Sequence, residues 1–504
     1  MSIGGMLESH GVRRAALAAA PLAALSLALS AHADDNHRVV RAAAPEGAIE
    51  HILVINLENE SENVTFGGCP ASPPPGNANY LNCTLLKQGE LIQNYYATSH
   101  VSLGNYIAEV SGQETNATLN SDCIDAASLT NPPVVGQFTN ITPGTDADTT
   151  ANPQFAGQVV GSGCVFPKPT PATHGAQTIG DQLDKADDER HGHDRDGHDR
   201  DAWRDHVLWR EYAEDMGNDA SRDFGTPDLL GGTDCAHPAI GSPDLTNSAQ
   251  GGPIVDQYAD RHAPFVYFHS VIDDPQRCNE HVVPLGTVFV GTNGSPDVFS
   301  GHLYEDLARI ETTPKFMFVT PNLCDDGHDA TCAGVNVEGG KTGGLTGANL
   351  WLAHWIPMIM ASPAYQSGKL LLVITVDESG SDTGAGANAC PNAVQSTCLS
   401  PIGPNLRNPG WSPLLGGLIP GYPTSDPAAF TFPGGGQIGT VLLNKRLIAP
   451  GTVNTTGYYN HYSALRSYED LLGLTEGGDD GHGHLGYAGT TGMLPFGKDV
   501  FNAK

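Results

Sequence analysis

Three short apolar runs of the sequence end in side chains that could hold a metal ion. The runs are HILVINL (51–57), FMFVT (316–320) and KLLLVITV (369–376), and they are followed by Glu58 with Asn59, by PNLCDDGH ending at His328, and by Asp377 with Glu378. A single acid of this kind most often caps a helix or joins an ion pair. Several together repel each other unless a cation lies among them, and oxygen ligands favour a hard ion. We therefore expect one divalent ion here, with Mg²⁺, Ca²⁺, Mn²⁺ and Zn²⁺ all open.

Ser102 is the candidate nucleophile of the chain. It stands in SHVSLGN (99–105), just before an apolar stretch at 106–110 that is typical of a helix. A serine at a helix N-terminus meets backbone N–H groups and the positive end of the helix dipole, which suits a phosphate group. A neighbouring metal would lower the pKa of its hydroxyl and allow a phosphoserine intermediate. Taken alone, the position is equally typical of an ordinary helix-capping serine.

These groups need a framework, and the apolar runs predict one. Five β-branched runs bounded by turn residues predict buried strands at 51–57, 264–269, 316–320, 369–376 and 439–443. Runs that are apolar on both faces indicate a sheet covered on both sides, so we expect an α/β fold with a mostly parallel central sheet sandwiched by helices. Helical spacing predicts one helix between Asn349 and Pro363, with a kink at Pro357, and another after His461. Ligands of such sheets bind at the carboxyl ends of the strands.

The N-terminal segment 1–33 reads as a secretory signal peptide. Arg13 and Arg14 precede an apolar run of about 16 residues, and Ala31-His32-Ala33 resembles a cleavage site. A retained membrane anchor fits less well, because the run is short and rich in alanine. We expect cleavage after Ala33, a secreted or periplasmic protein without stable membrane insertion, and a single domain over 34–504.

Charge and cysteine content narrow the possible partners. The formal charge of −31 disfavours nucleic acid and, more weakly, anionic lipid. All ten cysteines lie after residue 33, and an even number in an exported chain predicts disulfide-stapled loops. Sequential pairing is the simplest hypothesis, with Cys69/Cys83, Cys324/Cys332 and Cys390/Cys398 each closing a short loop. The sequence leaves the connectivity and the oligomeric state open.

The segment 187–205, DDERHGHDRDGHDRDAWRD, is a low-complexity insert too polar to form a core. A solvated surface loop is the favoured interpretation. The alternative is a metal-collecting arm, because His191, His193 and His198 lie close together in the sequence.

Nine motifs together resemble one known family. They are HILVINLENESENVTFG, SHVSLGNYIAEVSGQ, RHAPFVYFHSV, CNEHVVPL, FVTPNLCDDGHD, NLWLAHWIPMIMASPAY, LLLVITVDES, GGQIGTVLL and NHYSALRSYEDLLGL, which occur in this order between His51 and Phe501. In these motifs and their order, the chain resembles a family of bacterial phosphoesterases within the alkaline phosphatase superfamily. This family includes phosphatidylcholine-type phospholipases C and secreted acid phosphatases. The resemblance implies an alkaline-phosphatase-like fold and hydrolysis of phosphate esters.

The resemblance also implies roles for individual residues. The metal ligands would be Glu58, Asn59, Ser102, Asp377 and Glu378, with Ser102 also the nucleophile. Catalytic histidines would be His328, His461 and His262, and His269 and His281 could support them or simply lie in the core.

Two departures favour the phosphatase branch over the phospholipases. The phospholipases typically carry ENRSFDHYFG after the first strand, where this chain has ENESENVTFG, and Gly104 replaces a frequent proline. We therefore expect a small phosphate monoester as substrate, with a phospholipid diester as the nearer alternative. The alternative of another class is a non-catalytic, secreted metal-binding protein that uses the 187–205 segment.

Overall fold

The computed structural model describes most of the chain. The described residues are 39–72, 77–116, 118–123, 138–143, 157–171, 173–191, 207–219, 224–242, 255–328, 331–380, 404–405, 411–412, 417–418 and 434–503. The predicted signal peptide, most of the 187–205 insert and the Cys390/Cys398 pair lie outside them. The first five residues of that insert, 187–191, form the end of helix α4 (Ile179–His191).

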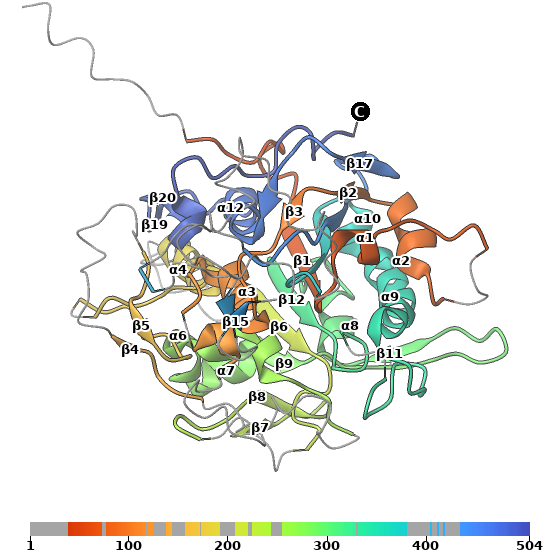
Figure 1. Cartoon of the computed structure of the whole chain (residues 1–504), viewed down its shortest axis with the longest axis horizontal. Helices are drawn as coiled ribbons and strands as arrows, with labels where there is room; N and C mark the ends of the chain where they lie inside the picture. Colours follow the sequence, from red (N-terminus) through yellow and green to blue (C-terminus); the bar gives the residue numbers. More distant parts are fainter. Residues whose placement is uncertain are drawn as a thin grey trace, which may run out of the picture. The chain divides into compact units, whose positions relative to one another are not determined.

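An eight-stranded sheet forms the centre of the unit Arg41–Lys504 (Figure 1). Its order is β17 (Thr452–Asn454), β2 (Glu90–Ile92), β16 (Thr440–Leu443), β13 (Leu370–Val376), β1 (His51–Leu57), β12 (Phe316–Thr320), β6 (Trp209–Ala213) and β9 (Val282–Pro284). Only β16 pairs antiparallel with its neighbours; all other pairings in this sheet are parallel. Every residue of β1, β12 and β13 is buried, as their continuous apolar sequences predict. The predicted α/β class and mostly parallel sheet are confirmed.

Helices cover both sides of this sheet. Figure 1 shows α3 (Ser102–Ser111), α4 and α12 (His461–Leu471) on one side, with α8 (His302–Asp306), α9 (Gly344–Ala361) and α10 (Pro363–Gln366) on the other. Further short helices are α1 (Glu62–Thr65), α2 (Tyr80–Cys83), α6 (His269–Ile272) and α7 (Pro275–His281). The described residues contain no helix long and apolar enough to cross a membrane.

Two predicted elements differ from the structure. The run 264–269 is not a strand: Pro264–Tyr267 is a 3-10 helix that leads into α6. Pro264 sets the helical φ of the first turn, and a short run buried on all sides does not distinguish a strand from a buried helix. Helix α9 begins at Gly344 rather than after Asn349, and Pro357 lies within it. Gly347 permits this extension, because a Cβ there would lie 2.4 Å from the carbonyl oxygen of Cys324.

Three disulfides confirm the expected stapled loops. They join Cys69 to Cys83, Cys123 to Cys164 and Cys235 to Cys278, which are sequential pairs. The predicted Cys324–Cys332 bond is absent, and both thiols are buried and free. Burial and the neighbouring thiol of Cys332 raise the pKa of Cys324, so the two side chains lie together without a bond. Disulfides of this number fit an oxidising compartment.

Candidate active site

The carboxyl ends of three adjacent strands bring the predicted acids together. Strands β1 and β13 pair up to Leu57 and Val376, and the N–H of Asp377 then donates to the carbonyl of Leu57 at 3.0 Å. On the other side of β1, the N–H of Glu58 donates to the carbonyl of Asp326 at 2.8 Å. These bonds continue the sheet by one residue, so the side chains of Glu58, Asp377 and Asp326 emerge at one edge.

Asn59 lies at the centre of this edge. Its φ is +43°, in the left-handed region that asparagine tolerates better than most residues. The turn lets its N–H donate to Asp377 Oδ1 at 2.9 Å. One end of its side-chain amide faces oxygens of Glu58, Asp377 and Glu378 at 3.0–3.3 Å, and the other end lies 3.0 Å from His328 Nε2. Without a cation the amide nitrogen suits the carboxylates, whereas a cation there would require the amide oxygen.

Ser102 is not the cap of its helix. Val101 occupies the N-cap position of α3, and Ser102 is the first helical residue. Its Oγ donates to Glu58 Oε2 at 3.0 Å and lies 3.4 Å from Asn59 Oδ1. The serine is only 2% exposed, so its hydroxyl faces the carboxylates at this edge of the sheet and not the solvent.

Residues of α3 and of the 3-10 helix Asp260–His262 complete the surroundings of Glu58. Tyr106, one turn after Ser102, donates from its hydroxyl to Glu58 Oε1 at 2.6 Å. His262 Nε2 lies 3.1 Å from the same oxygen, and its ring stacks on Tyr106 with centroids 5.3 Å apart. Burial, followed by Arg261 and His328, holds the pKa of His262 well below its usual value. A neutral His262 is therefore the expected form at neutral pH.

The acids of this edge are costly to ionise together. Burial and, after it, the charge of Asp326 raise the pKa of Glu58 to about 8, although Arg261, His328 and the Tyr106 hydroxyl oppose that rise. Burial, then Glu58 and Glu378, raise the pKa of Asp377 well above its usual range. Such groups are stabilised either by protons or by a cation. Carboxylate, amide and hydroxyl oxygens around one point form a donor set that fits a hard divalent cation.

Arg261 brings positive charge to the start of α3. Its Nε lies 3.8 Å from Asp122 Oδ2, and its side chain is 10% exposed. Asp122 Oδ1 also accepts from the N–H of Leu103 at 3.1 Å. The first helix N–H after Ser102 is thus bound by a carboxylate, although an incoming anion was expected to bind there.

His461 is buried behind Asp377. Its Nε2 lies 2.8 Å from the main-chain carbonyl of Asp377, and its Nδ1 lies 2.7 Å from Glu109 Oε1. Glu109 Oε2 accepts in turn from Asn56 Nδ2 at 2.8 Å. Both ring nitrogens of His461 therefore face acceptors within the protein, and its side chain is 0% exposed.

The other histidines divide into two groups. His328 is exposed at the edge beside Asn59, and buried His100 Nδ1 contacts Glu378 Oε2. His269 lies elsewhere, between Asp273 and Asn140, both at 2.8 Å. His281 stacks on Trp209, with ring centroids 4.2 Å apart, and contacts its carbonyl. Neither of the last two contacts the residues around Ser102.

The sequence analysis assigned no role to four residues that contact this site or its supports. They are His100, Tyr106, Glu109 and Arg261. Helical spacing could have identified two of them, because Tyr106 and Glu109 follow Ser102 by four and seven residues and so share its helix face.

Comparisons with known proteins assign no family. No family model matches the chain, and no curated protein matches it. A structure titled Ps i-CgsB in complex with k-i-k-neocarrahexaose is 10% identical, with a TM-score of 0.31, and the match covers 84% of this chain and 72% of that one. The PsFucS1 sulfatase from Pseudoalteromonas sp. is 12% identical, with a TM-score of 0.34, over 87% of this chain and 71% of that one. Likenesses at this level assign neither fold nor activity.

Proposed function

We propose that this protein is a secreted, metal-dependent phosphoesterase that hydrolyses phosphate monoesters through Ser102. The observation that carries the proposal is the contact between the Ser102 hydroxyl and Glu58 Oε2 in a buried, acid-rich edge. At this position the Ser102 hydroxyl has an acceptor for its hydrogen, and oxygen atoms that could bind a cation lie beside it. The disulfides support export of the protein.

Glu58, Asn59, Asp377 and Glu378 would hold one divalent ion, with the Ser102 oxygen as a further ligand. When bound, such an ion lowers the pKa of the hydroxyl and offsets negative charge on the phosphate. It would also replace the protons that the buried acids otherwise need. His100 keeps Glu378 in place through its contact with Oε2.

The protein's own groups account for the remaining steps. Ser102 Oγ bonds to phosphorus as the ester oxygen leaves on the opposite side, and Glu58 Oε2 is the nearest acceptor for the hydroxyl hydrogen. Arg261, which lies beside Asp122 at the start of α3, would bind the phosphate oxygens. Exposed His328 is placed to give a proton to the leaving oxygen, and water then hydrolyses the phosphoserine.

His262 and His461 act differently in this scheme. His262 contacts Glu58 and fixes its orientation from the Tyr106 side. His461 has both nitrogens engaged, so it positions Asp377 through the main chain and transfers no proton to the leaving group.

The test measures the kcat/KM of the purified protein with four substrates: an aryl phosphate, an aryl phosphodiester, an aryl sulfate and phosphatidylcholine vesicles. We expect the highest kcat/KM on the monoester, loss of activity with a chelator and recovery with one of Mg²⁺, Ca²⁺, Mn²⁺ or Zn²⁺. Diacylglycerol formation as the main reaction would favour the phospholipase alternative. A higher kcat/KM on the sulfate would contradict the phosphate assignment, and full activity after chelation would contradict the metal.

A further inference from the structure

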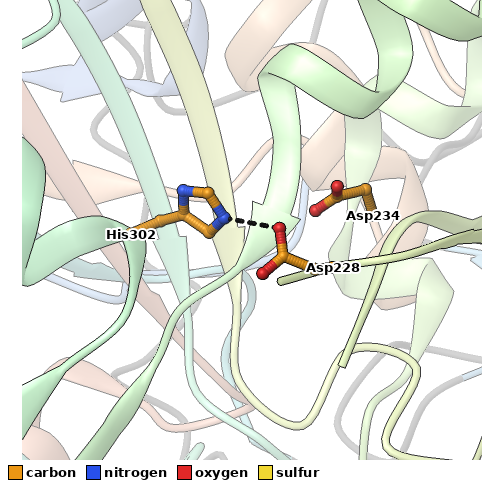
Figure 2. Close-up of side chains that lie close together, drawn as sticks. All are labelled: Asp228, Asp234 and His302. Atoms are coloured by element: carbon orange, nitrogen blue, oxygen red, sulfur yellow. Dashed lines mark hydrogen bonds and ion pairs between the residues drawn. The ribbon is translucent and has the colours of Figure 1, made fainter. Parts of the chain in front are cut away.

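A second group of potential metal ligands lies away from Ser102, among residues that the proposed reaction does not use. Figure 2 shows Asp228, Asp234 and His302 directed toward one another. Each offers one ligand atom, and these three atoms lie within 4.8 Å of one another. His302 Nε2 is 2.9 Å from Asp228 Oδ2. The three residues come from two separate parts of the chain, the β7–β8 hairpin and the start of α8.

The hairpin holds its two carboxylates in a fixed relation. Strands β7 (Phe224–Pro227) and β8 (Thr233–His237) pair antiparallel, and the N–H of Asp228 donates to the carbonyl of Gly232 at 3.1 Å. The disulfide Cys235–Cys278 ties β8 to α7. The geometry of the two acids is thus set by the backbone and a covalent bond, as a preformed site requires.

The charges of this cluster leave room for a divalent cation. Arg210 Nη1 lies 3.4 Å from His302 Nδ1 and is bound by both oxygens of Asp306 at 2.9 and 2.7 Å. The charge of Arg210 also acts on Asp234, but one guanidinium shared with Asp306 does not balance the two carboxylates of the cluster. Asp234 Oδ1 is buried and accepts no hydrogen bond within the described part of the chain.

The two acids are close enough to disfavour joint ionisation. Burial, followed by the charge of Asp228, raises the pKa of Asp234 to about 7.

We propose that Asp228, Asp234 and His302 form a structural site for a borderline divalent cation, with Zn²⁺ as the best fit. One imidazole nitrogen with two carboxylate oxygens suits Zn²⁺, whereas Ca²⁺ and Mg²⁺ prefer oxygen ligands alone. Binding of the ion through His302 Nε2 places the ring proton on Nδ1, and Arg210 then keeps its bonds to Asp306 and to the carbonyl of Glu280. The ion ties the β7–β8 hairpin to α8, and this role is independent of the chemistry at Ser102.

The test is Zn²⁺ binding by the full mature protein after chelator treatment and dialysis. Wild-type protein should retain one more equivalent of Zn²⁺ than Asp234→Asn or His302→Gln, and this difference should persist in an Asp377→Asn background. The matched control is Asp273→Asn, which alters another Asp–His pair, that of Asp273 and His269 at 2.8 Å. The control should bind as much Zn²⁺ as the wild type.

Stability gives a second readout. In the Asp377→Asn background, Zn²⁺ at a hundredfold excess over Kd should raise the melting temperature by about 3 °C, with little change for Mg²⁺ or Ca²⁺. Equal Zn²⁺ content in wild type and both variants would overturn the proposal. If the variants do not fold, anomalous scattering at the zinc edge from wild-type crystals decides: a peak between the three side chains supports the site, and its absence removes it.

Discussion

His461 donates from Nε2 to the main-chain carbonyl of Asp377, over 2.8 Å, and does not face Ser102. The same ring contacts Glu109 on α3 at 2.7 Å. One imidazole therefore links the helix that carries Ser102 to the residue that follows β13. These contacts favour a positioning role for His461, which the sequence analysis proposed as a catalytic histidine.

This relationship predicts how His461 variants behave. His461→Ala should lower kcat or raise the metal concentration needed for half-maximal activity by about 10–100-fold, as for other groups that support metal ligands. KM and the pH profile should change little, because the ring transfers no proton. His461→Gln, which can still donate to the carbonyl, should recover part of the loss. Disappearance of one limb of the pH profile in His461→Ala would instead identify His461 as a general acid.

Ser102→Ala should lower kcat on an aryl phosphate by at least roughly 10³-fold, because the nucleophile is removed. Ser111→Ala on the same helix is the control, since Ser111 Oγ donates to the Ile107 carbonyl at 2.6 Å and lies outside the acid cluster. Circular dichroism should show both variants folded. A Ser102→Ala protein with near wild-type turnover would rule out the serine mechanism.

Arg261→Gln should lower kcat/KM on the monoester by about 10–100-fold, equivalent to the loss of one or two charge-assisted hydrogen bonds. Inhibition by inorganic phosphate should weaken in parallel. Arg309→Gln provides the control, because Arg309 is exposed on another part of the surface. Unchanged phosphate inhibition in Arg261→Gln would show that this side chain does not bind the phosphate.

Glu90→Gln should stabilise the protein at alkaline pH. Glu90 is 1% exposed, and burial raises its pKa from 4.5 to about 7, although Asn502 donates to its Oε2 at 2.8 Å. Because the folded state holds this proton more tightly than the unfolded state, wild type loses stability as the pH rises from 4.5 through 7. Glutamine keeps an acceptor for Asn502 and has no charge.

The free energy of unfolding of Glu90→Gln should match that of wild type at pH 4 and exceed it at pH 8 by on the order of 1–2 kcal/mol. Denaturant titrations at both pH values measure this difference. An equal change at both pH values would mean that ionisation of Glu90 does not contribute.

The sequence by itself determined the sheet and the residues that follow its strands. The runs ending at Leu57, Thr320 and Val376 are apolar at most positions and are followed by polar residues, a pattern typical of strands buried on both faces. It failed at 264–269, where an equally apolar run folds as helix, because local composition does not specify which way a buried segment turns.

Only the tertiary structure decided which side chains meet. Ser102 reads locally as a helix cap, and it becomes a candidate nucleophile because α3 lies against the end of β1 and brings Oγ to within 3.0 Å of Glu58. The sequence analysis proposed both His461 and His328 as catalytic, yet His461 is buried between Glu109 and the Asp377 carbonyl, whereas His328 is exposed beside Asn59. Contacts between residues hundreds of positions apart depend on packing, which no local pattern encodes.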